Sequence, residues 1–481
     1  MSLSTTALET VSTARSTLSN PSRTTLSGIT LDAAIDDLAA LLDGEVVRPS
    51  ETGWDQARAA WQLGVDQRPV AVVVARSEAD IARTLRLASR MGVRVAPQGT
   101  GHGAAAVGDL SDAILLRTAA LAYVTIDAER RTATVGAGAT WGDVLAAAAP
   151  HGLSGLSGSS GTVGVVGYCL GGGLGWLGRL HGLGAHSVLS ARVALPGGAV
   201  VVASASEHAD LWWALRGGGG AGVVTELTVR LYDVPRLTAG TLWWPRERAD
   251  EVLKTWSRLL PTLPREITST ARVLRFPDID EVPPAIRGGS FVLVQAAVVG
   301  SPWLADRLLA PLRALDPVMD DVAPVTPDAL GHLAMDPPDP SAGAAEGVIL
   351  ASLDDAAIEA WLAALDSDHC AGVVAAELRH LGGALAHGSV DDAALTGIDG
   401  AVAAVAVAPV TPAAALDQAV AMVDVALASL GPWVGDHQYA NFVERPTAER
   451  TLVGVAVDRL DAVRLSYDPD GTVVRRHGPT D

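Results

Sequence analysis

The alternation of apolar and polar positions predicts regular elements from about residue 68 onward. The β-branched run RPVAVVVAR at 68–76 predicts a strand, and the amphipathic stretch EADIARTLRLASRMG predicts a helix directly after it. Ser77 and Asp80 have the spacing of a capping box at the start of that helix. The short apolar run VRVAP predicts a second strand, so this part of the chain reads as strand, helix and strand.

The pattern continues with short strands and turns up to residue 235. AILLR predicts a strand, and YVTID and RTATVGAG predict a hairpin closed around AERR. A helix is expected to start at Thr140. A hairpin with a Pro-Gly-Gly turn is predicted for SARVALPGGAVVVASA. A short helix that ends at glycines is predicted for HADLWWALRGGGG, and a strand with alternating apolar and polar residues is predicted for VVTELTVRLYDV.

The second half repeats this mixture with longer elements. GTLWW, SFVLVQAAVV and AVAAVAVAPV predict strands, while SPWLADRLLAPLRAL and TPAAALDQAVAMVDVALASL predict Ala-rich helices. We therefore expect four parts: a mobile Ser- and Thr-rich arm at 1–30, a first domain at 31–235, a second α+β domain with its own sheet at 236–430, and a segment at 431–481 that packs back on the first domain.

Composition narrows the function classes. The net charge is −19 and no basic run occurs, so nucleic acid is not an expected partner. Only two cysteines are present, which excludes a disulfide framework and a Cys-rich metal site and is typical of a reducing cytoplasm. Neither a signal peptide nor a membrane-spanning stretch is expected. Abundant Ala, Gly, Val and Arg with little Lys is typical of a GC-rich bacterial genome.

A histidine inside a glycine-rich turn, PQGTGHG at 97–103, is the first candidate site. Three glycines within five residues allow positive φ angles and close approach to a ligand, which favours a ligand-binding loop around His102. A surface turn with a solvated histidine remains the alternative from this stretch alone.

Three other motifs resemble known functional sites but lack the neighbouring residues that those sites require. GLGWLG at 173–178 has the glycine spacing of a dinucleotide-binding loop, but no acidic residue follows at the distance that a ribose would need. His181 and His186 lack further ligands at metal-binding spacing, so no metal site is expected. GLSGSSG misses the spacing of a nucleophile elbow, because Ser159 stands where its closing glycine should be.

Taken together, four segments resemble the vanillyl-alcohol-oxidase superfamily of FAD-linked oxidases, in the branch with a berberine-bridge-enzyme-like C-terminal segment. They are RPVAVVVARSEADIARTLRLASRMGVRVAPQGTGHG, SGTVGVVGYCLGGGLGWLGRLHGL, GGGGAGVVTELTVRL and YANF. The resemblance covers about 50–235 and 431–450. It implies an α+β fold with a two-part PCMH-type FAD-binding domain and a substrate domain whose mainly antiparallel sheet is covered by helices.

The resemblance also implies where the cofactor binds. His102 occupies the position whose imidazole is bonded to the 8α-methyl group of FAD, and this link raises the flavin potential and retains the cofactor. The other implied FAD-binding residues are Gln98, Gly99, Thr100, Gly101, Gly103, Gly138, Gly158, Ser160, Gly161, Thr162, Val163, Gly164, Gly167, Tyr168, Gly222, Val223 and Asn441.

A single covalent link is expected. Relatives with a second link carry its cysteine upstream of GGGLG, at the position where this chain has Ser160, so we interpret Cys169 as a small buried packing residue. Val163 matches a position near flavin C4a at which relatives use a bulkier side chain to block dioxygen. Valine there favours an oxidase over a dehydrogenase.

Tyr439 in DHQYANF matches the family tyrosine that faces the substrate and can act as a base. If this segment is an edge strand, His437, Tyr439 and Asn441 share one face by alternation. A tyrosine base needs a neighbouring donor, because the free phenol has a pKa near 10. Glu444 stands where the family usually has aspartate, and Trp212 and Trp213 are interpreted as packing aromatics.

The resulting hypothesis is an oxidase that transfers hydride from a small-molecule alcohol, sugar, phenol or amine to FAD, with dioxygen as acceptor and hydrogen peroxide as product. Two alternatives stay open: a dehydrogenase or secondary-metabolite tailoring enzyme with poor oxygen reactivity, and a flavin-binding protein without turnover.

Overall fold

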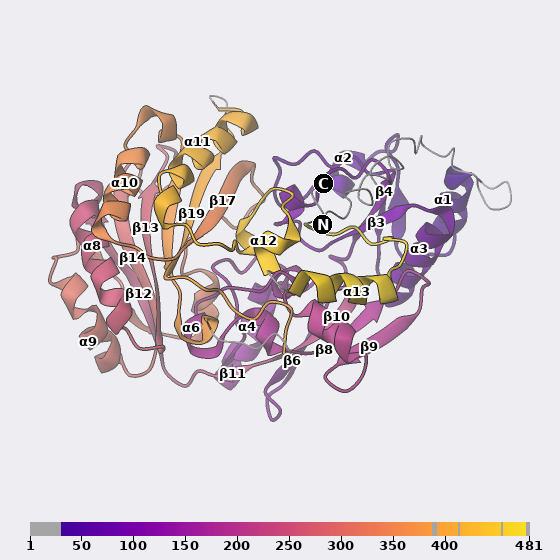
Figure 1. The fold of residues 1–481 in the computed structure, drawn as a ribbon, viewed down its shortest axis with the longest axis horizontal. Coiled ribbons are helices and arrows are strands. Elements are labelled where there is room, and N and C mark those ends of the chain that lie inside the picture. Colours follow the sequence, from indigo (N-terminus) through magenta and orange to yellow (C-terminus); the bar gives the residue numbers. More distant parts are fainter. Residues whose placement is uncertain (1–29, 387–391, 412–413, 454–455, 478–481) are drawn as a thin grey trace, which may run out of the picture.

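The computed structural model describes residues 30–386, 392–411, 414–453 and 456–477, and the predicted arm at 1–30 lies outside them except for its last residue (Figure 1). That residue, Thr30, caps helix α1 (Leu31–Ala39) by accepting a hydrogen bond from Ala33. None of the helices in these ranges has the length and apolar character needed to cross a membrane.

The first sheet contains the predicted strand–helix–strand unit. Its order is β1-β2-β4-β3, and β2 and β3 both run parallel to β4. Its elements are β1 (Glu45–Val47), α2 (Trp54–Arg58), β2 (Ala71–Val74), α3 (Glu78–Met91), β3 (Arg94–Gln98) and β4 (Ala113–Arg117). Glycine-rich residues 99–103 follow the C-terminal end of β3, so the parallel strands present this turn at one edge of the sheet.

The start of α3 differs in one respect from the predicted capping box. Ser77 is the N-cap and its hydroxyl accepts a hydrogen bond from the backbone of Asp80, as predicted. The Asp80 carboxylate does not complete a capping box, because it accepts backbone hydrogen bonds from Asp43, Gly44 and Arg76. This carboxylate therefore joins α3 to the loop before β1, a contact that local spacing does not reveal.

The second sheet is antiparallel and contains both predicted hairpins. Its order is β5-β6-β10-β8-β9. The elements around it are β5 (Val124–Asp127), β6 (Thr132–Gly136), α4 (Trp141–Ala148), β7 (Leu153–Ser154), α5 (Val165–Leu170), α6 (Gly178–His181), β8 (Val188–Ala194), β9 (Val200–Ser204), α7 (Ala209–Leu215), β10 (Val223–Arg230) and β11 (Tyr232–Asp233). Thr140 caps α4 in a full capping box with Asp143.

The third sheet is large and antiparallel. Its strands follow the order β15-β12-β14-β13-β18-β19-β17, with β16 also paired to β12. The elements of this half are β12 (Leu237–Pro245), α8 (Ala249–Leu259), β13 (Ile267–Arg275), β14 (Ser290–Val299), α9 (Pro302–Arg313), β15 (Met319–Asp320), β16 (Ala323–Val325), β17 (Gly343–Leu350), α10 (Asp355–Leu365), β18 (Ala375–His380), β19 (Val402–Pro409) and α11 (Leu416–Ala428).

Helices cover one face of the third sheet. Figure 1 shows α8, α9, α10 and α11 on the outer side, away from the first two sheets. The largest apolar core joins these helices to the sheet and includes Trp244, Trp256 and Trp361, all fully buried. The α+β fold class with a helix-covered antiparallel sheet is thereby confirmed. The opposite face of the sheet is turned toward the first two sheets.

The last segment lies across the first two sheets. It contains α12 (Glu449–Val453) and α13 (Val457–Tyr467), and α13 packs on α7. Val473 then pairs in parallel with Val95 of β3. Residues 473–477 therefore run beside the strand that leads into the glycine-rich turn.

Candidate functional site

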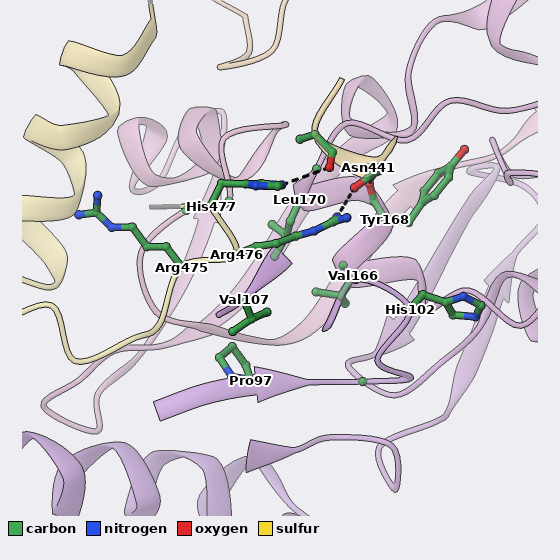
Figure 2. Close-up of a pocket in the computed structure, with 18 of the residues that line it drawn as sticks. Pro97, His102, Val107, Val166, Tyr168, Leu170, Asn441, Arg475, Arg476 and His477 are labelled. Atoms are coloured by element: carbon green, nitrogen blue, oxygen red, sulfur yellow. Dashed lines mark hydrogen bonds between the residues drawn. The ribbon is translucent and has the colours of Figure 1, made fainter. Parts of the chain in front are cut away.

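A cavity of about 430 Å³ lies where the three sheets and the C-terminal segment meet. Most of its wall comes from five stretches of chain: 96–104 after β3, 158–174 around α5, 217–224 before β10, 439–444, and 473–477. Figure 2 shows His102, Val166, Tyr168, Asn441 and Arg476 around this space. Segments from both ends of the sequence therefore form one site.

Glycine backbone forms much of the cavity wall. Gly219 and Gly222 have φ angles of +75° and +107°, which other residues rarely adopt. Gly167 has open space on the side where a Cβ would be, with no atom within 4 Å. These glycines leave room for a ligand to approach the backbone closely.

His102 is held in a defined orientation. Its ring stacks on Trp61 with centroids 4.0 Å apart and an interplanar angle of 19°. Nε2 lies 3.0 Å from Thr162 Oγ1 in a hydrogen bond, and Nδ1 makes no hydrogen bond with the residues that the structure describes. Burial lowers the pKa of His102 to about 4, so the imidazole is neutral at pH 7.

Four of the predicted cofactor residues do not line the cavity: Gly138, Ser160, Gly161 and Thr162. Gly138 packs closely under the carbonyl groups of Thr118 and Ala119. The Ser160 and Thr162 hydroxyls are 2.9 Å apart, so they form a short chain that ends at His102. These hydroxyls can therefore influence a ligand indirectly, by orienting the imidazole of His102.

The other predicted residues all line the cavity: Gln98, Gly99, Thr100, Gly101, His102, Gly103, Gly158, Val163, Gly164, Gly167, Tyr168, Gly222, Val223, Tyr439 and Asn441. Cys169 is fully buried in the core of the second sheet, where burial raises the pKa of its thiol. This placement agrees with its interpretation as a packing residue. Trp213 is likewise buried in that core.

The segment around Tyr439 is not an edge strand. Residues Ala440–Phe442 form a 3-10 turn, and His437 is exposed. The turn folds Asn441 back, so its Nδ2 donates to the Tyr439 hydroxyl at 3.1 Å and to the Tyr168 carbonyl at 3.0 Å. Tyr439 and Asn441 are therefore neighbours, as expected, but through a turn and without His437.

The Tyr439 phenol is almost fully buried. Burial raises its pKa to about 12, although the Asn441 amide and the backbone N–H groups of Gly173 and Leu174 oppose this shift. The phenol is therefore neutral at pH 7. Donors that would stabilise a phenolate are nevertheless in place.

Sequence reasoning missed the basic residues of the C-terminal segment. Arg476 Nη1 donates to Asn441 Oδ1 at 2.6 Å, and its guanidinium covers Gly103, where a Cβ would lie 2.8 Å from Cζ (Figure 2). His477 Nε2 donates to the Ala440 carbonyl at 3.2 Å. The run RRH was the only local signal, and it gave no indication of position.

Glu444 is a second residue of the wall that sequence reasoning did not place there. It accepts hydrogen bonds from Gln62 Nε2 at 3.3 Å and from the Ala345 backbone at 3.2 Å. Burial raises its pKa to about 7, against the effect of these donors and of Arg476. The carboxyl group thus titrates near neutrality while it links the loop after α2, the third sheet and the C-terminal segment.

The cavity fits FAD chemically. Its wall combines glycine backbone with side-chain donors that have no partner among the described residues, including Gln98 Nε2 and Arg476 Nε. An anionic diphosphate and a planar ring with polar edges would supply acceptors for such groups. His102, Tyr439 and Arg379, which comes from β18, bring reactive or charged side chains to the same space.

Comparison with known proteins gives the same result. A family model described as FAD binding domain matches residues 69–204. The (R)-6-hydroxynicotine oxidase of Paenarthrobacter nicotinovorans is 30% identical over 282 residues, which are 58% of this chain and 60% of that enzyme. The chain spans between 25% and 60% of the first curated relatives that it matches.

Solved structures match over nearly the whole chain. The crystal structure of 6-hydroxy-D-nicotine oxidase from Arthrobacter nicotinovorans has a TM-score of 0.79 and 25% identity, covering 92% of this chain and 98% of that one. BBE-like 1 from Physcomitrella patens shares the fold, with a TM-score of 0.78 and 20% identity over 91% of this chain and 97% of its own. The FAD binding domain match, the 6-hydroxynicotine oxidase relatives and this fold confirm the predicted resemblance to FAD-linked oxidoreductases and BBE-like oxidases.

Proposed function

We propose that this protein is an oxidase that holds FAD through a single covalent bond to His102 and oxidises a small-molecule alcohol, sugar, phenol or amine. When bound, FAD accepts a hydride from the substrate and passes the electrons to dioxygen, which becomes hydrogen peroxide. The observation that carries the proposal is the neutral, oriented imidazole of His102 in the wall of a glycine-lined cavity that fits FAD.

His102 is suited to form the bond through Nδ1. When Nε2 carries the proton and donates to Thr162, Nδ1 presents its lone pair, and stacking on Trp61 restricts rotation of the ring. The low pKa keeps that lone pair available at neutral pH. Cys169 is too deeply buried to compete, which supports a single link.

Tyr439 is the proposed acceptor of the substrate proton. Its hydroxyl lies in the cavity wall and receives a hydrogen bond from Asn441, so a phenolate there would be stabilised as the proton leaves the substrate hydroxyl or amine. The neutral phenol must first lose its own proton, so this role requires a base form that becomes more abundant as pH rises.

Val163 supports dioxygen as the electron acceptor. Its side chain lines the cavity in the loop before α5, and it is small enough to leave space beside the ligand. The remaining FAD contacts are proposed for Gln98, Gly99, Thr100, Gly101, Gly103, Gly158, Gly164, Gly167, Tyr168, Val223, Asn441 and the glycines of 217–222, all of which line the cavity.

The test uses purified protein and its His102→Ala variant. We expect wild-type protein to remain yellow after acid precipitation and to yield a flavin peptide that contains His102 and neither Cys169 nor Ser160. The variant should release any bound FAD into the acid supernatant. A colourless wild-type pellet contradicts the covalent link.

Turnover is then tested with a panel of alcohols, sugars, phenols and amines, read by flavin bleaching and peroxide release. Bleaching with stoichiometric peroxide in air supports the oxidase. Bleaching without peroxide identifies a dehydrogenase or tailoring enzyme, and the absence of bleaching with every class identifies a flavin-binding protein.

A further inference from the structure

Arg379 is a charged residue of the cavity wall that the proposed reaction does not use. It lies on β18, on the face of the third sheet that is turned toward the first two sheets. Its guanidinium lines both the main cavity and a small adjoining pocket of about 20 Å³. The adjoining pocket is formed by Ser159, Leu174, Gly175, Trp176, Thr268, Thr270 and Arg379.

One edge of this guanidinium is held by protein and the other is free. Nε and Nη2 bind Glu377 Oε2 at 2.9 and 2.7 Å, and Nη2 also lies 3.3 Å from Ser159 Oγ. Nη1 makes no hydrogen bond or ion pair with the residues that the structure describes. The guanidinium is thus held in one orientation, and its Nη1 group can still donate hydrogen bonds to a ligand.

The charged residues around Arg379 are arranged so that its positive guanidinium is the one that faces the cavity. Glu377 is shared, because Arg272 Nη2 also binds it at 2.6 Å, and Arg272 has a second acidic neighbour, Asp336, at 3.4 Å. Of these four charged side chains only Arg379 lines the cavity. The two carboxylates lie behind it, so a ligand in the cavity meets a cation first.

Apolar side chains stand next to this cation. Arg379 Cζ lies 5.1 Å from the centroid of the Phe442 ring, and Phe442 contacts Tyr439 edge to face with centroids 4.9 Å apart. Leu174 lines both cavities. A ligand that places an anionic group on Arg379 can therefore rest its apolar part on Phe442 and reach Tyr439.

We propose that Arg379 determines substrate specificity by binding a carboxylate, so that the substrate of this enzyme is an anionic molecule with an apolar body next to the carboxylate. This proposal rests on the proposed function in one respect, namely that the cavity beside Tyr439 receives the substrate. Charge-assisted hydrogen bonds from Nη1, in a space shielded from water, provide the preference for a carboxylate over a neutral group of the same shape.

The experiment measures binding to the flavin-loaded protein by calorimetry, which does not depend on turnover. The probes are benzoate and benzamide, which have the same shape and differ in charge. We expect wild-type protein to bind benzoate at least about tenfold more tightly than benzamide, as one charge-assisted hydrogen bond provides. Arg379→Gln should bring this ratio close to one, and Arg379→Lys should retain part of it.

The control is Arg475→Gln, which removes a positive charge from another part of the cavity wall. It should leave the ratio of the two dissociation constants nearly unchanged, because the Arg475 charge lies beside Asp461 and solvent screening weakens its effect on a ligand that it does not contact. Glu377 keeps its bond to Arg272 in the Arg379 variants, and melting temperature and flavin content verify their fold.

Three outcomes overturn the proposal: wild-type protein that binds benzoate no more tightly than benzamide, benzoate that fails to bind up to its solubility, and a ratio that falls equally in Arg475→Gln. Failure of the oxidase assay with intact carboxylate selectivity would reject the proposed function alone. Oxidase activity with neutral substrates and no carboxylate selectivity would reject the role of Arg379 alone.

Discussion

The pKa of Tyr439 decides how the proposed proton transfer responds to pH. Because burial raises this pKa to about 12, the phenolate fraction grows about tenfold with each pH unit throughout the neutral and mildly alkaline range. We therefore expect the anaerobic rate of flavin reduction by a bleaching substrate to rise with that slope from about pH 7 to about pH 10, measured by stopped flow.

Tyr439→Phe should lose on the order of a hundred- to ten-thousand-fold in this rate, lose the pH slope and keep its flavin. Tyr467→Phe is the matched control, because burial also raises the pKa of Tyr467 to about 12 but its hydroxyl binds Asp210 away from the cavity. A flat profile in wild-type protein, or a Tyr439→Phe variant that reduces as fast as wild type, would show that Tyr439 is a packing residue.

Helix α5 offers a test of the glycine wall that leaves folding intact. Gly167 lies within this helix at an ordinary φ angle, and no atom lies within 4 Å of the point that its Cβ would occupy, so a side chain there meets only the cavity. Replacing glycine in a helix also removes backbone entropy from the unfolded chain. We expect Gly167→Leu to keep or raise thermal stability without FAD and to weaken FAD binding by at least about tenfold.

Reversible FAD binding is measured by fluorescence quenching in a His102→Ala background, which removes the covalent bond. Gly197→Leu is the control, because Gly197 also has no atom within 4 Å of its Cβ position and lies in the β8–β9 turn outside the cavity. Unchanged affinity in Gly167→Leu would place FAD away from α5.

The two halves of the molecule are joined by a buried arginine. Arg179 of α6 binds the backbone carbonyls of Ile267 and Leu263 and lies 2.6 Å from His380 Nε2 on β18. Burial and the neighbouring cation lower the pKa of His380 to about 3. The histidine must therefore be neutral for this contact between the first two sheets and the third.

This contact predicts acid sensitivity. Between about pH 6.5 and about pH 3 the unfolded chain binds a proton at His380 that the folded chain does not, so the free energy of unfolding falls as pH falls. His380→Gln, which can still accept from Arg179, should reduce this slope by about 1.4 kcal/mol per pH unit. Urea denaturation at a series of pH values measures the slope.

His369→Gln, at an exposed position, controls for the exchange of histidine for glutamine itself. Equal slopes in wild-type protein and His380→Gln would mean that His380 is protonated in the folded molecule or does not face Arg179.

The sequence alone determined most elements and the main cofactor segments. The sequence predicted both hairpins, the helix caps at Ser77 and Thr140, and the turn around His102. These features depend on periodicity, capping and glycine placement, which act over a few residues. The resemblance to FAD-linked oxidoreductases also followed from ordered short motifs, each of which is weak by itself.

Only the tertiary structure decided which distant side chains complete the site. Arg379, Arg476 and Glu444 reach the cavity from segments far from His102 in the chain, and no local pattern distinguishes them from surface charges. Alternation around Tyr439 misled because it presupposes a strand, whereas packing folds 440–442 into a turn. Long-range packing sets these positions and the pKa values of the buried groups, since burial depends on which segments meet and not on neighbouring residues in sequence.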